Sequence, residues 1–99
     1  MATLTRDTAI AELRLRKAAF EQDFGVIRIG IFGSFARGDA REDSDVDIVV
    51  ELRESDLFSL VHIKETLAED FKRKVDIVSL RPGMNEYLRK RIMEEAVYA

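Results

Sequence analysis

The sequence of 99 residues contains no cysteine, no tryptophan, one proline and one histidine. Without cysteine there is no disulfide framework, no thiolate nucleophile and no cysteine-ligated zinc site. The one histidine, His62, lies between Val61 and Ile63 in a stretch of helical periodicity. We therefore expect His62 to have a structural or surface role rather than a catalytic one.

Long apolar runs and an excess of positive charge are also missing. No run approaches the length of a membrane span, and the first residues, MATLTRDTAIAEL, lack the apolar segment of a signal peptide. The net charge is −3, and the basic clusters at 72–74 and 89–91 are short enough to be solvated helix faces. We expect a cytoplasmic protein that binds neither a membrane nor nucleic acid directly.

The sequence has the composition of a folded protein, with 46% hydrophobic and 35% charged residues. Its length allows one core but not two, which predicts a single domain over residues 1–99. Apolar residues at helical spacing alternate along the chain with runs of β-branched residues. The segment 33–43, GSFARGDARED, is predicted to be a loop with one helical turn. The predicted helices cover about 5–23, 56–72 and 85–97, and the predicted strands cover 26–32, 44–52 and 74–80.

The loop between the first two predicted strands is too short for a full helical crossover. Antiparallel or mixed pairing is therefore expected there. The fold class is α+β (α/β), with a small mixed sheet of three to four strands and helices packed on it.

The tetrapeptide VDIV occurs twice, at 46–49 and at 75–78, and each copy carries one aspartate. Side chains alternate along a strand, so Asp45 and Asp47 are expected on one side, roughly 6–7 Å apart along the backbone. If the third strand lies beside the second, Asp76 joins them. Three such carboxylates would repel one another, and a hard cation such as Mg²⁺ would offset that repulsion. Exposed acids at a sheet rim are the alternative, and the matching context of Asp76 favours a site.

A calcium loop is a second way to interpret these acids. Asp43, Asp45, Asp47 and Glu54 occupy positions 1, 3, 5 and 12 of an EF-hand loop. Position 6 of that loop requires glycine for a sharp turn, and here it is Ile48. The strand-forming residues that follow also oppose the curvature of the loop. The pattern argues against calcium binding.

Gly33 and Ser34 come directly after the first predicted strand. A glycine lets a ligand approach the backbone, and Ser34 offers a hydroxyl and an N–H that suit a phosphate. An ordinary turn is the alternative, and the chain has neither a P-loop motif nor a G-x-G-x-x-G motif. Ser34 has no nearby base in the sequence, which argues against a serine nucleophile. Followed by the aspartates, this turn is typical of phosphoryl or nucleotidyl transfer.

The stretch GSFARGDAREDSDVDIVV resembles the G-S-x-x-[RK]-G…[ST]-D-x-D signature of the DNA polymerase beta-like nucleotidyltransferase superfamily. With the lead-in GVIRIGIFGSFARG and the ending RIMEEAVYA, the whole chain resembles a minimal nucleotidyltransferase of the MNT type. The resemblance implies that Gly33 and Ser34 contact the β- and γ-phosphates of ATP. Arg37 falls on the basic position of the motif, where it touches the nucleotide or braces the loop.

The resemblance also implies a metal site, an activity and a partner. Asp45 and Asp47 would ligate Mg²⁺, with Asp76 as third ligand and activator of the acceptor hydroxyl, and two ions in the active complex. The chain would act as the antitoxin of a toxin–antitoxin pair. It would transfer AMP from ATP to a hydroxyl, expected to be a tyrosine's, of a HEPN-type RNase toxin, with which it forms a hetero-oligomer.

Two alternative functions stay open on the sequence alone. An antitoxin could neutralise its toxin by binding alone, since an apolar face reserved for a partner looks like a core face in sequence. A transferase could instead act on a small hydroxyl acceptor, which would need a partner domain or a homodimer to complete the pocket. Larger relatives hold nucleic acid or an antibiotic with an additional domain, which the resemblance to a minimal member does not lead us to expect here, and this favours a protein target.

Overall fold

The computed structural model describes residues 4–99. In this range the chain forms an α+β fold with one mixed sheet, which confirms the predicted fold class. None of the helices in this range is both long and apolar enough to span a bilayer. The helices are α1 (Arg6–Phe24), α2 (Ser34–Arg37), α3 (Leu57–Phe71) and α4 (Glu86–Glu95), and the strands are β1 (Val26–Phe32), β2 (Val46–Leu52), β3 (Val75–Ser79) and β4 (Val97–Tyr98).

The sheet has the strand order β3-β2-β1-β4. Strands β1 and β2 are antiparallel, as the short connection between them predicts. Strand β3 lies parallel to β2, because α3 forms the crossover between these two strands. The condition under which Asp76 joins the other aspartates, a third strand beside the second, is therefore met.

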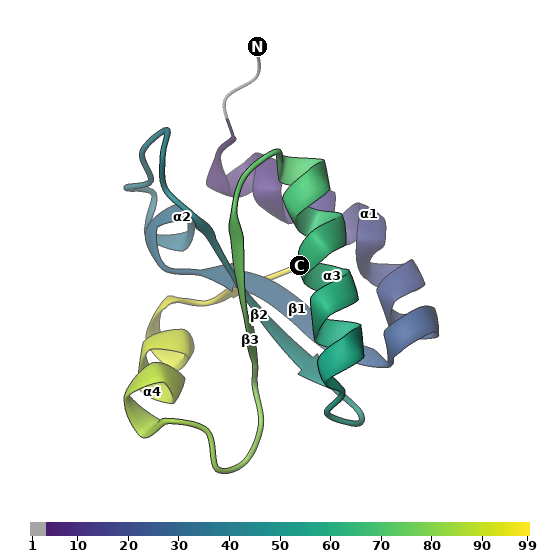
Figure 1. Ribbon diagram of the computed structural model, residues 1–99. Coiled ribbons are helices and arrows are strands. Elements are labelled where there is room, and N and C mark those ends of the chain that lie inside the picture. Colours follow the sequence, from purple (N-terminus) through teal and green to yellow (C-terminus); the bar gives the residue numbers. More distant parts are fainter. Residues whose placement is uncertain (1–3) are drawn as a thin grey trace.

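The two faces of the sheet are covered by different helices (Figure 1). Helices α1 and α3 lie on one face and α4 lies on the other. Along β2 the side chains alternate between these faces. Val46, Ile48 and Val50 belong to the main apolar core under α1 and α3, whereas Val49 packs with Ile92 of α4 in a second, smaller cluster.

Helices α1 and α3 begin at side chains that cap their first turn. The Thr5 hydroxyl accepts a hydrogen bond from the Thr8 N–H at 3.2 Å, and the Thr8 hydroxyl accepts one from the Thr5 N–H at 2.8 Å. Asp56 caps α3 by accepting a hydrogen bond from the Phe58 N–H at 3.1 Å. These bonds satisfy N–H groups that have no partner within the helix.

The end of the chain differs from the prediction. The predicted last helix ran to Val97, but α4 ends at Glu95 and Val97 starts the strand β4. Strand β4 pairs with β1, with Val97 opposite Ile31 and Tyr98 opposite Gly30. A side chain at Gly30 would meet the Val97 carbonyl oxygen at 2.5 Å, so glycine allows this close approach. Pairing with the free edge of β1 decides the conformation, which the helical periodicity before Val97 does not reveal.

Candidate active site

A tight turn joins β1 to α2. Gly33 has φ 74° and ψ −149°, a conformation that is essentially restricted to glycine. A Cβ at this position would also collide with the carboxylate of Asp47. The half-buried Ser34 starts the single turn of α2, which confirms the predicted helical turn in this loop. The backbone of Gly33 thus lies directly against Asp47.

The N–H of Gly33 is bonded to a side chain from the other end of the chain. It donates to Oε1 of Glu95 at 3.0 Å, and the Arg37 guanidinium donates to the same oxygen at 3.1 Å. Arg91, one helical turn before Glu95 in α4, approaches that oxygen at 3.6 Å. Arg37 also bonds Asp39 at 3.2 Å. The glycine turn is therefore already an anion-binding site, with a carboxylate as the anion.

The three predicted aspartates lie near one end of β2 and β3. Asp47 is opposite Phe32 of β1 and opposite Asp76 of β3, so the second and third strands bring these two acids into register. Asp45 lies one residue before β2 rather than inside it, and its carboxylate is 3.8 Å from the ammonium of Lys74. Asp47 is half-buried and Asp76 is exposed.

The environment of Asp47 disfavours its negative charge. Burial raises the pKa of the Asp47 carboxyl above its usual value, and the nearby charges of Asp76 and Asp45 raise that pKa further. The positive charges of Arg91 and Arg37 act in the opposite direction. The two arginines therefore lie within electrostatic reach of both the aspartates and Glu95.

A metal ion would suit the chemistry of this site. Carboxylate oxygens are the hard ligands that Mg²⁺ prefers, and a cation would offset the repulsion that raises the pKa of Asp47. Within residues 4–99, however, no three side chains of the metal-binding types are arranged so that they could hold an ion. The donor chemistry thus fits magnesium, while the assignment of the three ligands stays a prediction.

The loop before Asp45 is braced by Arg73. One nitrogen of its guanidinium donates to the backbone carbonyl of Glu42 at 2.7 Å and to that of Ser44 at 3.1 Å. The guanidinium also lies over the ring of Phe35, 5.2 Å from the ring centre. Arg73 belongs to the basic cluster 72–74, which the sequence suggested was a solvated helix face. For Arg73 that interpretation is wrong, because the residue fastens the segment that leads into β2.

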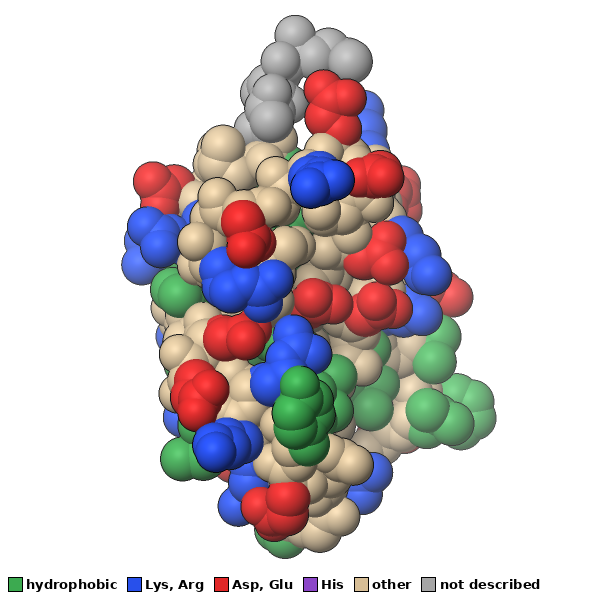
Figure 2. Space-filling view, turned by 90° about the vertical axis from the view of Figure 1, so that its left-hand side faces the viewer, with side chains coloured by type: hydrophobic (Ala, Val, Ile, Leu, Met, Phe, Trp, Pro, Cys, Tyr) green, Lys and Arg blue, Asp and Glu red, His purple; other side chains and the backbone are tan. Residues whose placement is uncertain are grey.

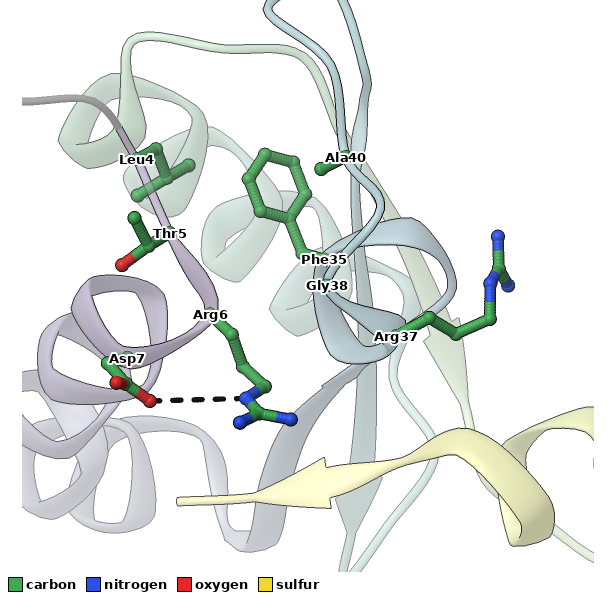
Figure 3. A pocket seen from close by; sticks show the side chains of 8 residues that line it. All are labelled: Leu4, Thr5, Arg6, Asp7, Phe35, Arg37, Gly38 and Ala40. Atoms are coloured by element: carbon green, nitrogen blue, oxygen red, sulfur yellow. Dashed lines mark ion pairs between the residues drawn. The ribbon is translucent and has the colours of Figure 1, made fainter.

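A hollow lies between α2 and the start of α1 (Figure 3). Its volume is about 450 Å³. Leu4, Phe35 and Ala40 form an apolar wall, and Arg6 is paired with Asp7 at 3.9 Å on the rim. The guanidinium of Arg37 points away from Leu4 and Thr5 (Figure 3). Arg37 lines this hollow as well, while its guanidinium donates to the Glu95 carboxylate at the glycine turn.

The face that carries α2 and α4 has charges of both signs. Figure 2 shows acidic and basic side chains intermixed over it, without a large patch of one sign. A hollow of about 350 Å³ on this face is lined by Tyr87, Lys90, Arg91, Glu94 and Glu95. It ends at the same Glu95 that binds Gly33.

Sequence reasoning did not predict Glu95 or Arg91 as site residues. A glutamate four residues after an arginine is typical of an ordinary ion pair on a helix surface. Glu95 is 62 residues away from Gly33, and no local pattern links the two. His62 has no place in the site, because its exposed ring stacks on Phe24 with the ring centres 5.9 Å apart. This agrees with the predicted structural or surface role.

Comparison with known proteins identifies the family. Residues 13–99 match the nucleotidyltransferase domain. The chain is 36% identical over 99 residues to the protein adenylyltransferase MntA of Thermococcus cleftensis, covering 99% of each protein. This chain belongs to the nucleotidyltransferase family. The predicted family and the predicted nucleotidyltransferase class are confirmed.

Solved structures also resemble this nucleotidyltransferase. A structure provisionally named a minimal nucleotidyltransferase superposes with a TM-score of 0.79 at 32% identity, covering 98% of both chains. The MNT antitoxin in complex with a tri-AMPylated HEPN toxin from Shewanella oneidensis has a TM-score of 0.70 at 18% identity, covering 95% of this chain and 71% of that one. At that identity the second similarity establishes the fold alone.

Proposed function

We propose that this nucleotidyltransferase transfers AMP from ATP to a hydroxyl group of a partner toxin and thereby acts as an antitoxin. The observation that carries the proposal is the contact of the Gly33 turn with Asp47, itself in register with Asp76. A phosphate-binding turn and two neighbouring carboxylates are the parts that nucleotidyl transfer requires. The similarity to a protein adenylyltransferase over almost the whole chain favours AMP as the transferred group and a protein as acceptor.

The reaction follows from the chemistry of the triphosphate. The acceptor hydroxyl oxygen, expected to be that of a tyrosine, forms a bond to the α-phosphorus. The bond from that phosphorus to the bridging oxygen of the β-phosphate breaks, and pyrophosphate leaves. Asp76 accepts the hydroxyl proton. Gly33 and Ser34 hold the β- and γ-phosphates, and Arg37 balances their charge.

Asp45 and Asp47 would hold Mg²⁺, with Asp76 as the third ligand. Bound Mg²⁺ ions, two in the active complex, would supply neutralisation of the triphosphate charge. Asp47 suits this role because its charge is disfavoured by burial and by two other carboxylates. A cation would therefore stabilise the ionised form of Asp47.

A HEPN-type toxin is the proposed partner. Structural neighbours include the MntA toxin–antitoxin pair and a toxin–antitoxin pair with AMP-PNP, at TM-scores of 0.69 and 0.70. These neighbours support the proposed partner through the shared fold alone. Transfer to an intracellular toxin would require a cytoplasmic location, which the sequence also predicts.

Transfer of label from ATP tests the proposal. The chain is incubated with Mg²⁺, α-labelled ATP and the protein encoded by the neighbouring gene. We expect label on the partner with the wild-type chain and with the control Asp43→Asn, an exposed acid in the preceding loop. The double variant Asp45→Asn/Asp47→Asn should give none. Equal labelling by the double variant would contradict the mechanism.

Neutralisation by binding alone is the second candidate, and exposed apolar side chains favour it. At the start of α3, Leu57 and Phe58 are 72% and 78% exposed, as expected for a contact surface. If the double aspartate variant still neutralises the toxin fully, binding suffices and transfer is not the cause. If that variant holds the complex together but fails to neutralise the toxin, transfer is required.

A further inference from the structure

Glu95 stands at the position where an anionic ligand of the Gly33 turn would have to bind. Its Oε1 accepts the Gly33 N–H at 3.0 Å and the Arg37 guanidinium at 3.1 Å, and Arg91 lies 3.6 Å away. A single N–H can serve only one strong acceptor at a time. An incoming phosphate oxygen and the Glu95 carboxylate therefore compete for the same donors.

The helix dipole does not account for a glutamate at this position. Glu95 is the last residue of α4, where the helix dipole favours basic rather than acidic side chains. Its side chain is only 20% exposed, so it also loses much of its hydration. What compensates the charge is the set of donors from Gly33, Arg37 and Arg91. These come from three different elements of the site.

The donor set is better matched to a phosphate than to one carboxylate oxygen. Two guanidinium groups surround a single oxygen, and arginine pairs with phosphate through two parallel hydrogen bonds. The ring of Phe32 lies under Arg91, 5.8 Å from its guanidinium carbon, and limits where that group can go. The hollow of about 350 Å³ beside Glu95 gives its carboxylate space to turn into while α4 stays in place.

We infer that Glu95 is an internal competitor for the triphosphate site: its carboxylate occupies the Gly33 N–H and the two arginines until the β,γ-phosphates of ATP displace it. This inference rests on the proposed function, because it takes ATP as the ligand. Glu95 sets the affinity for the triphosphate and returns to the same donors when pyrophosphate leaves. Glu95 therefore controls binding of the triphosphate and takes no part in making or breaking covalent bonds.

The test compares Glu95→Gln with the matched control Glu86→Gln. Glutamine keeps an oxygen that accepts the Gly33 N–H but removes the charge, and Glu86 is an exposed acid in the first turn of the same helix, outside the hollow beside Glu95. Binding is measured by calorimetry with Mg²⁺ and an ATP analogue that has a methylene group between the α- and β-phosphorus atoms. We expect Glu95→Gln to bind this analogue about tenfold more tightly, since a charge-assisted hydrogen bond is no longer broken. Glu86→Gln should match the wild type, and AMP, which lacks the β,γ-phosphates, should bind equally to all three.

Unchanged or weaker binding of the analogue by Glu95→Gln would overturn the inference. If the wild type binds the analogue no better than AMP, the proposed function fails as well, so the two failures are distinguishable. A second measurement on the wild type covers a variant that does not fold. On addition of sodium tripolyphosphate with Mg²⁺, the NMR signals of the Glu95 carboxylate carbon and the Gly33 amide should shift together. A Glu95 that only supports the structure would keep its carboxylate signal unchanged, and that result also contradicts the inference.

Discussion

The two faces of the sheet are made by the same strands but serve different purposes. Towards α1 and α3, β2 presents Val46, Ile48 and Val50, all fully buried in one large apolar cluster. Towards α4 it presents Asp47 and Val49, and the apolar cluster there is smaller. Because successive side chains of β2 point to opposite faces, residues that stabilise the core and residues that serve the chemistry are neighbours in the sequence. A charge at Asp47 is tolerated because the opposite face already holds the strand in place.

The largest effect on a measured rate should come from the face of the sheet that carries Asp47. We expect Asp47→Asn to lower the rate of AMP transfer by roughly 10²–10³-fold, because a metal ligand supplies several kcal/mol of transition-state stabilisation. The melting temperature should stay equal or rise, since burial and two carboxylates disfavour the charge of Asp47. Rate measurements and thermal unfolding of the same samples check this. A large fall in the melting temperature would mean that the face with Asp47 also contributes to the stability of the fold.

The neighbouring residue tests the opposite face. Ile48 is fully buried under α1 and α3. We expect Ile48→Ala to lower the free energy of unfolding by about 2–5 kcal/mol, as large-to-small changes in a core do. Transfer per folded molecule should be retained. Urea titration gives the stability, and activity at urea concentrations below the unfolding transition gives the rate. A variant that is stable but inactive would contradict the separation between the apolar face and the face that carries Asp47.

Gly33 affects both the stability of the fold and the transfer reaction, and Gly83 provides a control. Both have positive φ, 74° and 82°, but a Cβ at Gly33 meets Asp47 whereas a Cβ at Gly83 meets nothing within 4 Å. We expect Gly33→Ala to lower the free energy of unfolding by about 1–3 kcal/mol from backbone strain. It should also abolish transfer, because the new methyl group pushes on the Asp47 carboxylate. Gly83→Ala should lower stability while leaving transfer intact, and equal loss of transfer in both variants would exclude the contact with Asp47 as the cause.

The smallest effect should come from Asp56, the cap of α3, which lies on the side of the sheet away from Asp47. Hydrogen bonds from the Ser59 hydroxyl and the Phe58 N–H lower the pKa of the Asp56 carboxyl. A lowered pKa in the folded state means that Asp56 stabilises the fold above its unfolded pKa of about 3.9, and that this contribution is lost as the pH falls through the folded pKa. Asp56→Ala should lower the melting temperature slightly at pH 7, with a difference that shrinks below about pH 3.9.

Thermal unfolding of wild type and Asp56→Ala across this pH range measures the effect, with Ser55→Ala as the control. A difference that stays constant down to pH 2 would show that the charge of Asp56 is not what matters. Transfer at pH 7 should be the same for all three proteins, because α3 lies on the face away from Asp47.

Much of the fold was predictable because its signals are local. The β-branched runs gave β1, β2 and β3, and the short connection after β1 required an antiparallel neighbour. The two VDIV segments pair in register, so that Asp47 lies opposite Asp76, which the sequence alone had left conditional on the strand order. The strand β4 was missed because two residues are too short for a periodic signal. Their conformation is set by the edge of β1, which is distant in sequence.

The sequence by itself determined the family, the strand that carries Asp47 and the glycine that precedes it, since each depends on residues close together in the chain. The tertiary structure decided which groups surround that glycine. Glu95 reaches Gly33, with Arg91 beside the Glu95 carboxylate, because α4 packs on the face opposite to α1 and α3 and β4 then pairs with β1. Hydrophobic burial and strand pairing bring together a backbone N–H and a carboxylate that are 62 residues apart, and no local pattern encodes that contact.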